Sequence, residues 1–302
     1  MTFFVAGITG RVGGATARGL LERGHGVRAL VRDLARASAW AQSGVDLRKG
    51  DLTDASAVAA ALEGAEGAFL MLPPVLAPKP GFPEAKAIIS SLVEALGQWP
   101  PERVVALSSF GSEQASGLGL ITATHLLERA LDGLPCPTAF LRAGSFLENY
   151  LAGLDGAAHT GVLHSFVVPV DRPEPMIATA DIGKEAARLL DEGWSGRRIV
   201  EIGTPYSPND VARAMGEVLG RAVEARAIPR ERWTATLEAF GIAPGFTAAY
   251  EEMMDGVNSG WIAFGASDAV RVDGGFEAMQ LRLADGSTLP VQLFRRVREA
   301  AG

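Results

Sequence analysis

Three glycines near the start of the chain, Gly7, Gly10 and Gly13 in the run GITGRVGG, restrict its fold more than any other feature. An apolar run, FFVAG, precedes them, and apolar side chains at helical spacing follow. A strand, a glycine turn and a helix in this order let a dinucleotide pyrophosphate approach the backbone and meet the positive end of the helix. An ordinary strand-to-helix turn is the simpler alternative, but this context favours a cofactor loop. The residues predicted to contact the cofactor here are Gly7, Thr9, Gly10, Arg11, Val12 and Gly13.

The second predicted strand, VRALV, ends next to Arg32, about twenty residues beyond the glycine turn, where NAD-selective proteins place a carboxylate on the adenosine ribose. A guanidinium at this point instead matches a 2′-phosphate, because its planar fork binds phosphate oxygens in pairs. Arg11 and Arg28 offer further guanidinium groups nearby. We therefore predict NADP(H) as the cofactor, with NAD(H) still possible because Asp33 follows Arg32.

Composition excludes several classes of protein. The formal net charge of −7 argues against broad attraction to nucleic acid. No apolar run is long enough to span a membrane, and no basic segment or cleavage site precedes the first strand, so we expect a cytoplasmic protein without a membrane partner. The single cysteine, Cys136, and four histidines without ligand spacing predict no metal site.

Predicted strands and helices alternate from the N-terminus to the strand TAFLR, a pattern that requires parallel strands joined by helical crossovers. The fold class is therefore α/β, with a doubly wound parallel Rossmann-type sheet and a smaller, mainly helical C-terminal substrate lobe. We place the NADP-binding domain at 1–145 and the lobe at 146–302, with a strand near 197–203 returning to the main sheet. The segment LRLADGSTLPVQLF near the C-terminus reads as a hairpin.

Ligands of such sheets bind at the carboxyl ends of the strands. Asp51 there either accepts a hydrogen bond from the adenine amino group or caps the following turn. Ser109, at the end of the strand RVVALSS, faces the expected nicotinamide position, although serine also simply ends strands. The cofactor contacts predicted at these strand ends are Arg32, Asp51, Leu52, Leu72, Pro73, Pro74 and Ser108.

The ordered segments GITGRVGG, VRALVRD, GDLTD, FLMLPP, VVALSSFG and LRAGSFLENY together resemble the NmrA-like group of atypical short-chain dehydrogenase/reductases. The resemblance continues to about residue 262 through MIATADIGKEAARLL and IPRERW. It implies either an NADPH-dependent reductase of quinone- or azo-type acceptors or an NADP-binding regulator. It also implies that Phe146, Asn149 and Tyr150 line the substrate cleft.

The parent group of this family uses a tyrosine with a lysine four residues later as its acid, and this chain has no such pair. Leu120 and Thr124 stand at the matching positions of the helix LGLITATHLLERAL. His125 is the remaining titratable candidate there, although a histidine at a helix or subunit surface explains it as well. Glu128 reads as a carboxylate on the helix surface.

We therefore predict an NADPH-dependent reductase of a small, largely apolar, quinone-like electrophile. Ser109 and His125 are its candidate catalytic residues. Reactive acceptors need little acid catalysis, so positioning beside the hydride can carry the reaction. The alternative is a non-catalytic NADP(H)-binding redox sensor that acts through a protein partner. A homodimer is also compatible with the sequence.

Overall fold

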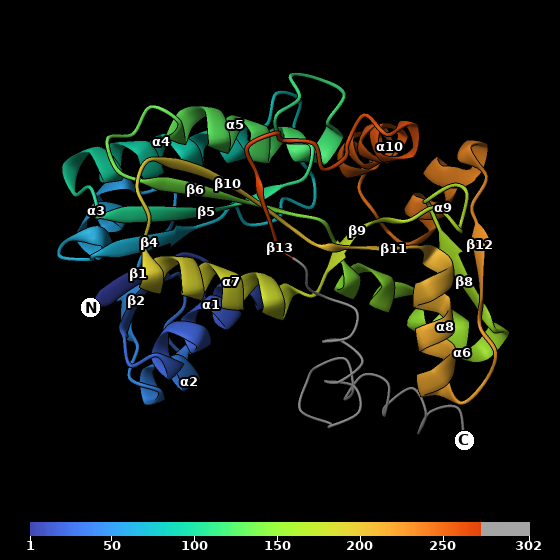
Figure 1. The fold of residues 1–302 in the computed structure, drawn as a ribbon, viewed down its shortest axis with the longest axis horizontal. Helices are drawn as coiled ribbons and strands as arrows, with labels where there is room; N and C mark the ends of the chain where they lie inside the picture. Colours follow the sequence, from blue (N-terminus) through green and yellow to red (C-terminus); the bar gives the residue numbers. More distant parts are fainter. Residues whose placement is uncertain (273–302) are drawn as a thin grey trace.

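The computed structural model describes residues 1–272 of the chain. The strands of its main sheet are β1 (Thr2–Val5), β2 (Gly26–Val31), β3 (Asp46–Lys49), β4 (Gly67–Leu70), β5 (Arg103–Ser109), β6 (Thr138–Ala143), β10 (Arg197–Ile202) and β13 (Val270–Val272). They form an eight-stranded sheet in the order β13-β10-β6-β5-β4-β1-β2-β3 (Figure 1). Every pair of neighbours is parallel. The predicted Rossmann-type α/β sheet is thus confirmed.

Helices cover both faces of this sheet, as parallel strands require (Figure 1). One face carries α1 (Arg11–Glu22), α2 (Ser38–Gln42) and α7 (Thr179–Glu192). The other carries α3 (Ala55–Leu62), α4 (Pro83–Gln98) and α5 (Thr122–Leu131). Each layer buries its apolar side chains in a separate core, one on each side of the strands. The strands therefore read as continuous apolar runs because both of their faces are buried.

The direction of the strand order reverses between β1 and β4, which lie side by side although β2 and β3 separate them in the sequence. In sheets of this kind, nucleotides bind beyond the carboxyl ends of the two strands at such a reversal, because the crossover helices leave them on opposite faces. The glycine turn follows β1 at this point, between Val5 and the first residue of α1, Arg11. The fold therefore brings the predicted cofactor loop to the place where such sheets bind nucleotides.

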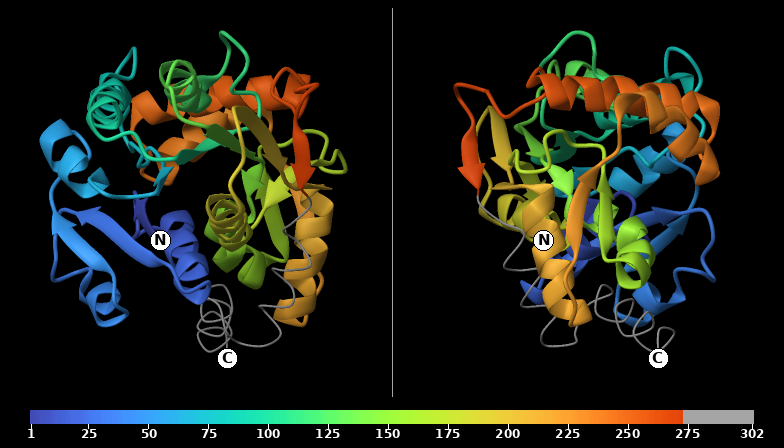
Figure 2. Two further views of the ribbon diagram at one scale, coloured as in Figure 1. Left: turned by 60° about the vertical axis from the view of Figure 1, so that its left-hand side comes forward. Right: turned by 90° about the vertical axis from the view of Figure 1, so that its right-hand side faces the viewer.

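A smaller lobe extends beyond the carboxyl edge of the main sheet, as Figures 1 and 2 show from several sides. Its helical elements are η2 (Leu147–Gly153), α6 (Leu154–Thr160), α8 (Pro208–Leu219), η3 (Arg230–Arg232), α9 (Trp233–Ala239) and α10 (Pro244–Ser259). Two small sheets complete it, β11 (Thr204–Tyr206) with β9 (Glu174–Ile177) and β7 (Ser145–Phe146), and β12 (Glu224–Ala227) with β8 (Val162–Ser165). One apolar core lies within the lobe, and a second joins the lobe to the segment between β5 and α5 of the main domain.

The elements differ from the sequence prediction in a few places. After VRALVRD the sequence predicts a helix near residues 34 to 43, but α2 begins only at Ser38, because Asp33 accepts hydrogen bonds from the backbone N–H groups of Ala35 and Arg36 and holds a turn there. Strand β10 lies in the segment near 197–203 that was expected to return to the main sheet, and it pairs along its whole length with β6. Strand β13, which the sequence did not indicate, adds the last strand beside β10. The predicted hairpin in 281–294 lies outside the described residues.

Candidate functional site

The turn after β1 has the geometry that close approach of a ligand to the backbone requires. Gly7 has a φ of +69°, a conformation that favours glycine, and its carbonyl accepts a hydrogen bond of 2.8 Å from the N–H of Gly10. A Cβ atom on Gly13 would lie 2.3 Å from the Gly7 oxygen, so only glycine lets the helix start this close to the turn. Thr9, Gly10 and Arg11 are exposed, whereas Val12 is buried in the core. The N-terminus of α1 is therefore presented to solvent.

Arg32 lies one residue beyond β2, at the same edge of the sheet, and is exposed. Its charge reaches Asp51, whose pKa is lowered chiefly by hydrogen bonds from the backbone and side chain of Thr53 and further by Arg32. Arg28 does not belong to this group. Its guanidinium donates to Asp46 at 2.8 Å and to the carbonyls at the end of α3, so the suggestion that it binds phosphate is wrong.

Asp51 caps the turn after β3, one of the two roles that the sequence left open for it. Its Oδ1 atom accepts hydrogen bonds of 2.9 Å from the N–H and 2.8 Å from the hydroxyl of Thr53. Leu52 and Leu72 are half-buried and pack against the core beneath α3 and α4. Pro73 and Pro74 are exposed directly after β4. A carboxylate and two prolines thus lie just beyond the carboxyl ends of β3 and β4, at the same edge of the sheet as the glycine turn.

Ser108, a predicted cofactor contact, is not exposed at this edge of the sheet, because its side chain is buried and its hydroxyl lies 2.5 Å from Glu128 of α5. Arg142 of β6 donates to both oxygens of Glu128, at 2.9 and 2.7 Å, and pairs with Glu113 at 2.8 Å. Glu128 is therefore the centre of a buried ion pair and not a carboxylate on the helix surface, as the sequence suggested. These contacts join β5, β6, α5 and the loop after β5.

Ser109, the last residue of β5, is only half-buried and pairs in register with Ala143 of β6. His125 of α5 lies close by through Ser112, whose carbonyl accepts a hydrogen bond of 2.8 Å from Nδ1 of the imidazole. The hydroxyls of Ser112 and Thr124 are 2.8 Å apart. Since the carbonyl oxygen only accepts, the Nδ1 atom carries a proton and Nε2 is the atom left for another partner.

The three predicted substrate residues lie on β7 and η2, directly beyond the carboxyl end of β6. Phe146 packs partly against the core of the main sheet, and Tyr150 against that of the lobe. Asn149 is exposed. This segment is held to the main domain by Glu148, whose carboxylate accepts hydrogen bonds from the backbone and hydroxyl of Thr179 at the start of α7. The segment therefore bridges the sheet and the lobe.

Sequence reasoning missed an acid at this junction. Glu174 begins β9 and is only 6% exposed, and its Oε2 atom has no hydrogen-bond partner among residues 1–272. Burial raises its pKa to about 7, against the nearby charge of Arg172 and a hydrogen bond from Ser145. Nothing in the sequence around EPMI marks Glu174, because its burial arises from segments distant in the chain.

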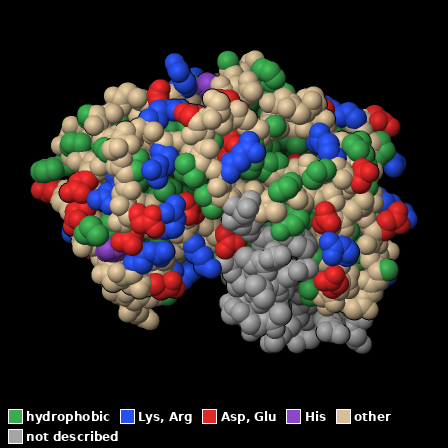
Figure 3. Space-filling view, viewed as in Figure 1, with side chains coloured by type: hydrophobic (Ala, Val, Ile, Leu, Met, Phe, Trp, Pro, Cys, Tyr) green, Lys and Arg blue, Asp and Glu red, His purple; other side chains and the backbone are tan. Residues whose placement is uncertain are grey.

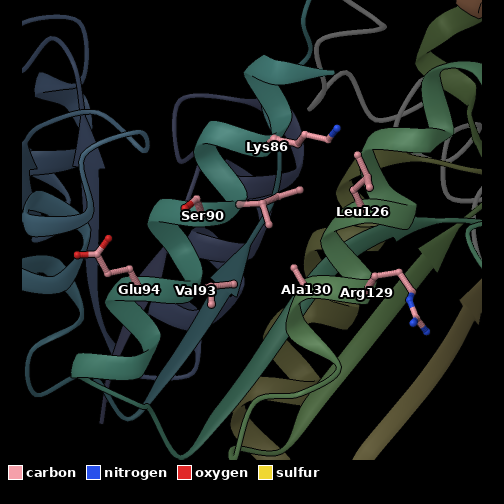
Figure 4. A pocket seen from close by; sticks show the side chains of 8 residues that line it. Lys86, Ser90, Val93, Glu94, Leu126, Arg129 and Ala130 are labelled. Atoms are coloured by element: carbon pink, nitrogen blue, oxygen red, sulfur yellow. The ribbon is translucent and has the colours of Figure 1, made fainter. Parts of the chain in front are cut away.

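One groove of the described surface lies between two helices of the main domain. This groove, of about 650 Å³, lies between α4 and α5, and its lining includes Ile89, Val93, Leu126, Lys86 and Arg129. Figure 4 shows side chains of both helices along it. It is on the outer side of these helices. Basic and acidic side chains are interspersed on the face seen in Figure 3.

Two features of the described residues concern metals and membranes. No group of three or more His, Cys, Asp and Glu residues in 1–272 has the arrangement of a metal site. No helix in this part of the chain combines the length and apolar character needed to cross a membrane. Cys136 is half-buried before β6, and burial raises the pKa of its thiol, which disfavours the reactive thiolate.

Known proteins share both the sequence pattern and the architecture. Residues 1–260 match the NmrA-like family. Quinone oxidoreductase 2 of Escherichia coli (strain K12) is 24% identical over 261 residues, which cover 85% of this chain and 88% of that protein. The NAD(P)H azoreductase of Xenophilus azovorans is 24% identical over 252 residues, covering 82% and 85%. A crystal structure of an Escherichia coli NADPH-dependent quinone oxidoreductase complexed with NADPH has a TM-score of 0.73 at 22% identity and covers 100% of both chains.

Proposed function

The chain belongs to the NmrA-like family, and on this premise we propose that it is an NADPH-dependent reductase that transfers a hydride to a small, largely apolar, quinone-like electrophile. The observation that carries the proposal is the exposed glycine turn at the reversal of strand order, with Arg32 at the neighbouring strand end. The relatives support it, since one is a quinone oxidoreductase and another an azoreductase.

In this proposal the N-terminal domain, 1–145, binds the cofactor. The backbone N–H groups at the start of α1 hold the pyrophosphate, together with Thr9 and Arg11, while Val12 keeps the helix packed. Arg32 binds the 2′-phosphate of NADPH, and NADH binds more weakly because it lacks that group. Asp51 and Leu52 lie on the adenine side. Leu72, Pro73 and Pro74 lie on the side of the nicotinamide ribose.

The lobe, 146–302, contributes the substrate side of the site. When bound, NADPH supplies the hydride, and the protein has to hold the acceptor against it. We assign this task to Ser109 at the end of β5 and to Phe146, Asn149 and Tyr150 beyond β6. His125 is a candidate acid only in its protonated form, because the neutral ring already donates its one proton to Ser112.

The test is NADPH consumption by the purified protein with a panel of quinones, azo dyes and imines, followed by absorbance. We expect turnover above the uncatalysed background with quinones and a lower kcat/KM with NADH than with NADPH. Calorimetry with NADPH alone establishes binding separately. Binding without turnover of any acceptor would contradict the reductase and leave the redox sensor with a protein partner, while a failure to bind either dinucleotide would contradict both functions.

A further inference from the structure

A buried carboxyl group, that of Glu174, lies near the phenols of Tyr150 and Tyr250 where the lobe joins the main sheet. Glu174 lies on β9, and the next residue of this strand packs on Gly144, where a Cβ atom would come within 2.4 Å of the Pro175 carbonyl oxygen. Gly144 directly follows β6, whose last residue, Ala143, stands opposite Ser109 in the sheet. Glu174 is therefore connected to Ser109, where we place the acceptor, through the contact of Pro175 with Gly144 and the pairing of Ala143 with Ser109.

Tyr150 and Tyr250, on two other elements, lie near enough to Glu174 for its charge to affect their phenols. Tyr150 lies on η2, and Tyr250 lies on α10, which packs so closely on η1 (Gly119–Ile121) that a Cβ atom on Gly119 would be 1.9 Å from the Ala249 carbonyl oxygen. Burial first, and then the charge of Glu174, raise the pKa of both phenols. Both hydroxyls therefore keep their protons around neutral pH.

Aromatic rings complete the surroundings of these polar groups. Phe166 packs edge-on against Tyr250, with ring centroids 5.2 Å apart, and also against Trp233 at 5.6 Å. Phe246 stacks on Tyr250 at 6.0 Å. Phe166, Phe246 and Tyr250 are only partly buried, so their rings can meet a planar, apolar molecule.

The nearby guanidinium of Arg172 lowers the pKa of Glu174 but forms no ion pair with it. Arg172 is turned to Asn258 of α10, to which it donates hydrogen bonds of 2.7 and 3.1 Å, and its Nε atom is buried without a partner among residues 1–272. No ion pair to Glu174 occurs in this part of the chain, and its Oε2 atom is unpartnered. The groups that face Glu174 are thus Arg172, Ser145, Tyr150, Tyr250 and its register neighbour on β11, Tyr206.

We propose that Glu174 is the proton donor of the reductase, in place of the missing tyrosine–lysine pair, and that it protonates the carbonyl oxygen of a planar, uncharged quinone held among the aromatic rings. This inference rests on the proposed reductase function. A buried carboxylic acid that is neutral near pH 7 is suited to donate to a carbonyl oxygen, as the ionised form is not.

When bound, NADPH would supply the hydride: a C–H bond of the dihydronicotinamide would break, and its hydrogen would pass with the electron pair to one carbonyl oxygen of the quinone, where it forms the first O–H bond while the nicotinamide is oxidised. The other quinone oxygen gains the negative charge through the conjugated ring. The O–H bond of the Glu174 carboxyl breaks, and its proton forms the second O–H bond of the hydroquinone on that oxygen. Tyr150 and Tyr250 donate hydrogen bonds to the developing charge and keep their protons. Water returns a proton to the Glu174 carboxylate.

The experiment measures kcat and KM for NADPH with an uncharged p-quinone between about pH 5 and 9, a range that brackets ordinary and shifted carboxyl pKa values. In the wild-type protein kcat should fall as the pH rises through about 7, the pKa of Glu174. Glu174→Gln should lower kcat about 10²-fold at low pH, the lower end of acid catalysis, and remove this fall. Glu174→Asp should retain it.

Two further variants identify the titrating group. His164→Gln, at an exposed position of β8 in the lobe, should leave the profile as in the wild type. An unchanged profile in Glu174→Gln, or a profile removed by His125→Gln alone, would assign the proton to another group and overturn the proposal. Circular dichroism and NADPH calorimetry check that each variant folds and binds cofactor.

A readout that needs no turnover separates this inference from the function on which it rests. Infrared difference spectra of the protein without cofactor should show the carbonyl stretch of a protonated, buried carboxyl group below neutral pH, and Glu174→Gln should lack it. Absence of this band from the wild-type spectrum overturns the proposal. Presence of the band in a protein that binds NADPH and reduces no acceptor contradicts the reductase and, with it, a role for Glu174 in catalysis.

Discussion

Arg32 carries a charge that the described part of the chain leaves exposed at the carboxyl edge, beside a turn built for phosphate. Its replacement by alanine should weaken NADPH binding by about 1.5–3 kcal/mol, the range for a hydrogen bond to a charged group, which is about 10- to 150-fold in Kd. NADH binding should change little, because NADH has no 2′-phosphate. Isothermal titration calorimetry with both dinucleotides measures the two effects.

Arg48→Ala is the matched control, since Arg48 is an exposed arginine on the next strand and is occupied by Asp46 at 2.9 Å. It should leave both affinities close to those of the wild type. Equal losses of affinity for NADPH and NADH in Arg32→Ala would show that Arg32 supports the loop and does not bind the 2′-phosphate.

The sequence identifies residues that act through the local backbone. It does not identify residues whose role depends on contacts with distant segments. The glycine turn can be recognised in the sequence, because a positive φ at Gly7 and the tight start of the helix at Gly13 both require glycine within a few residues. Ser108 and Glu128 look like any strand-end serine and helix carboxylate until Arg142 is brought between their elements. Glu174 is hidden in the same way, because its surroundings come from three other segments.

At the scale of elements, the closest helix contact in the main domain is that of α1 with α7. A Cβ atom on Gly183 of α7 would lie 2.3 Å from the Cβ of Ala15 and 2.6 Å from the backbone nitrogen of Thr16. Gly183→Ala should therefore force the helices apart and lower the free energy of unfolding by about 1–3 kcal/mol, although alanine is the better helix former. Urea denaturation followed by circular dichroism measures this loss.

Gly156 offers the same substitution inside another helix, α6, with open space around it. Gly156→Ala should raise the free energy of unfolding by about 0.5–1 kcal/mol, because it restricts the unfolded chain and meets nothing in the folded one. The opposite signs separate close packing from helix propensity. A stabilising Gly183→Ala would mean that α1 and α7 are not in this contact in solution.

Most elements of the main domain follow from the sequence because their periodicity is strong and their turns are marked. The pairing of α7 with α1 was not predicted, since the apolar stripe of α7 shows that it is buried but not against what. Strand β13 was not predicted, because Val270–Val272 is too short to show a hydrophobic periodicity. Its pairing depends on the position of β10 in the folded sheet. The small sheets of the lobe are likewise set by contacts between distant segments.

At the scale of the whole molecule, the junction between sheet and lobe links folding to pH through Glu174. The pKa of this carboxyl is raised from 4.5 to about 7 in the folded protein, chiefly by burial. Between these two values the folded protein keeps a proton that the unfolded chain has lost, so stability falls as the pH rises. The stability that the neutral carboxyl provides is fully present below about pH 4.5 and is lost by about pH 7.

Glu174→Gln removes this linkage, because the amide stays neutral at every pH. Its free energy of unfolding, relative to that of the wild type, should rise between pH 4.5 and 7 by roughly 3 kcal/mol, since each unit of pKa corresponds to about 1.4 kcal/mol, and then stay constant. Denaturant titrations at several pH values measure the difference, in which the titrations common to both proteins cancel. Glu22→Gln, at an exposed position on α1, should give a curve parallel to that of the wild type. A Glu174→Gln curve that is also parallel would show that the carboxyl is already ionised in the folded protein, because only a carboxyl that holds its proton at neutral pH makes the two curves diverge.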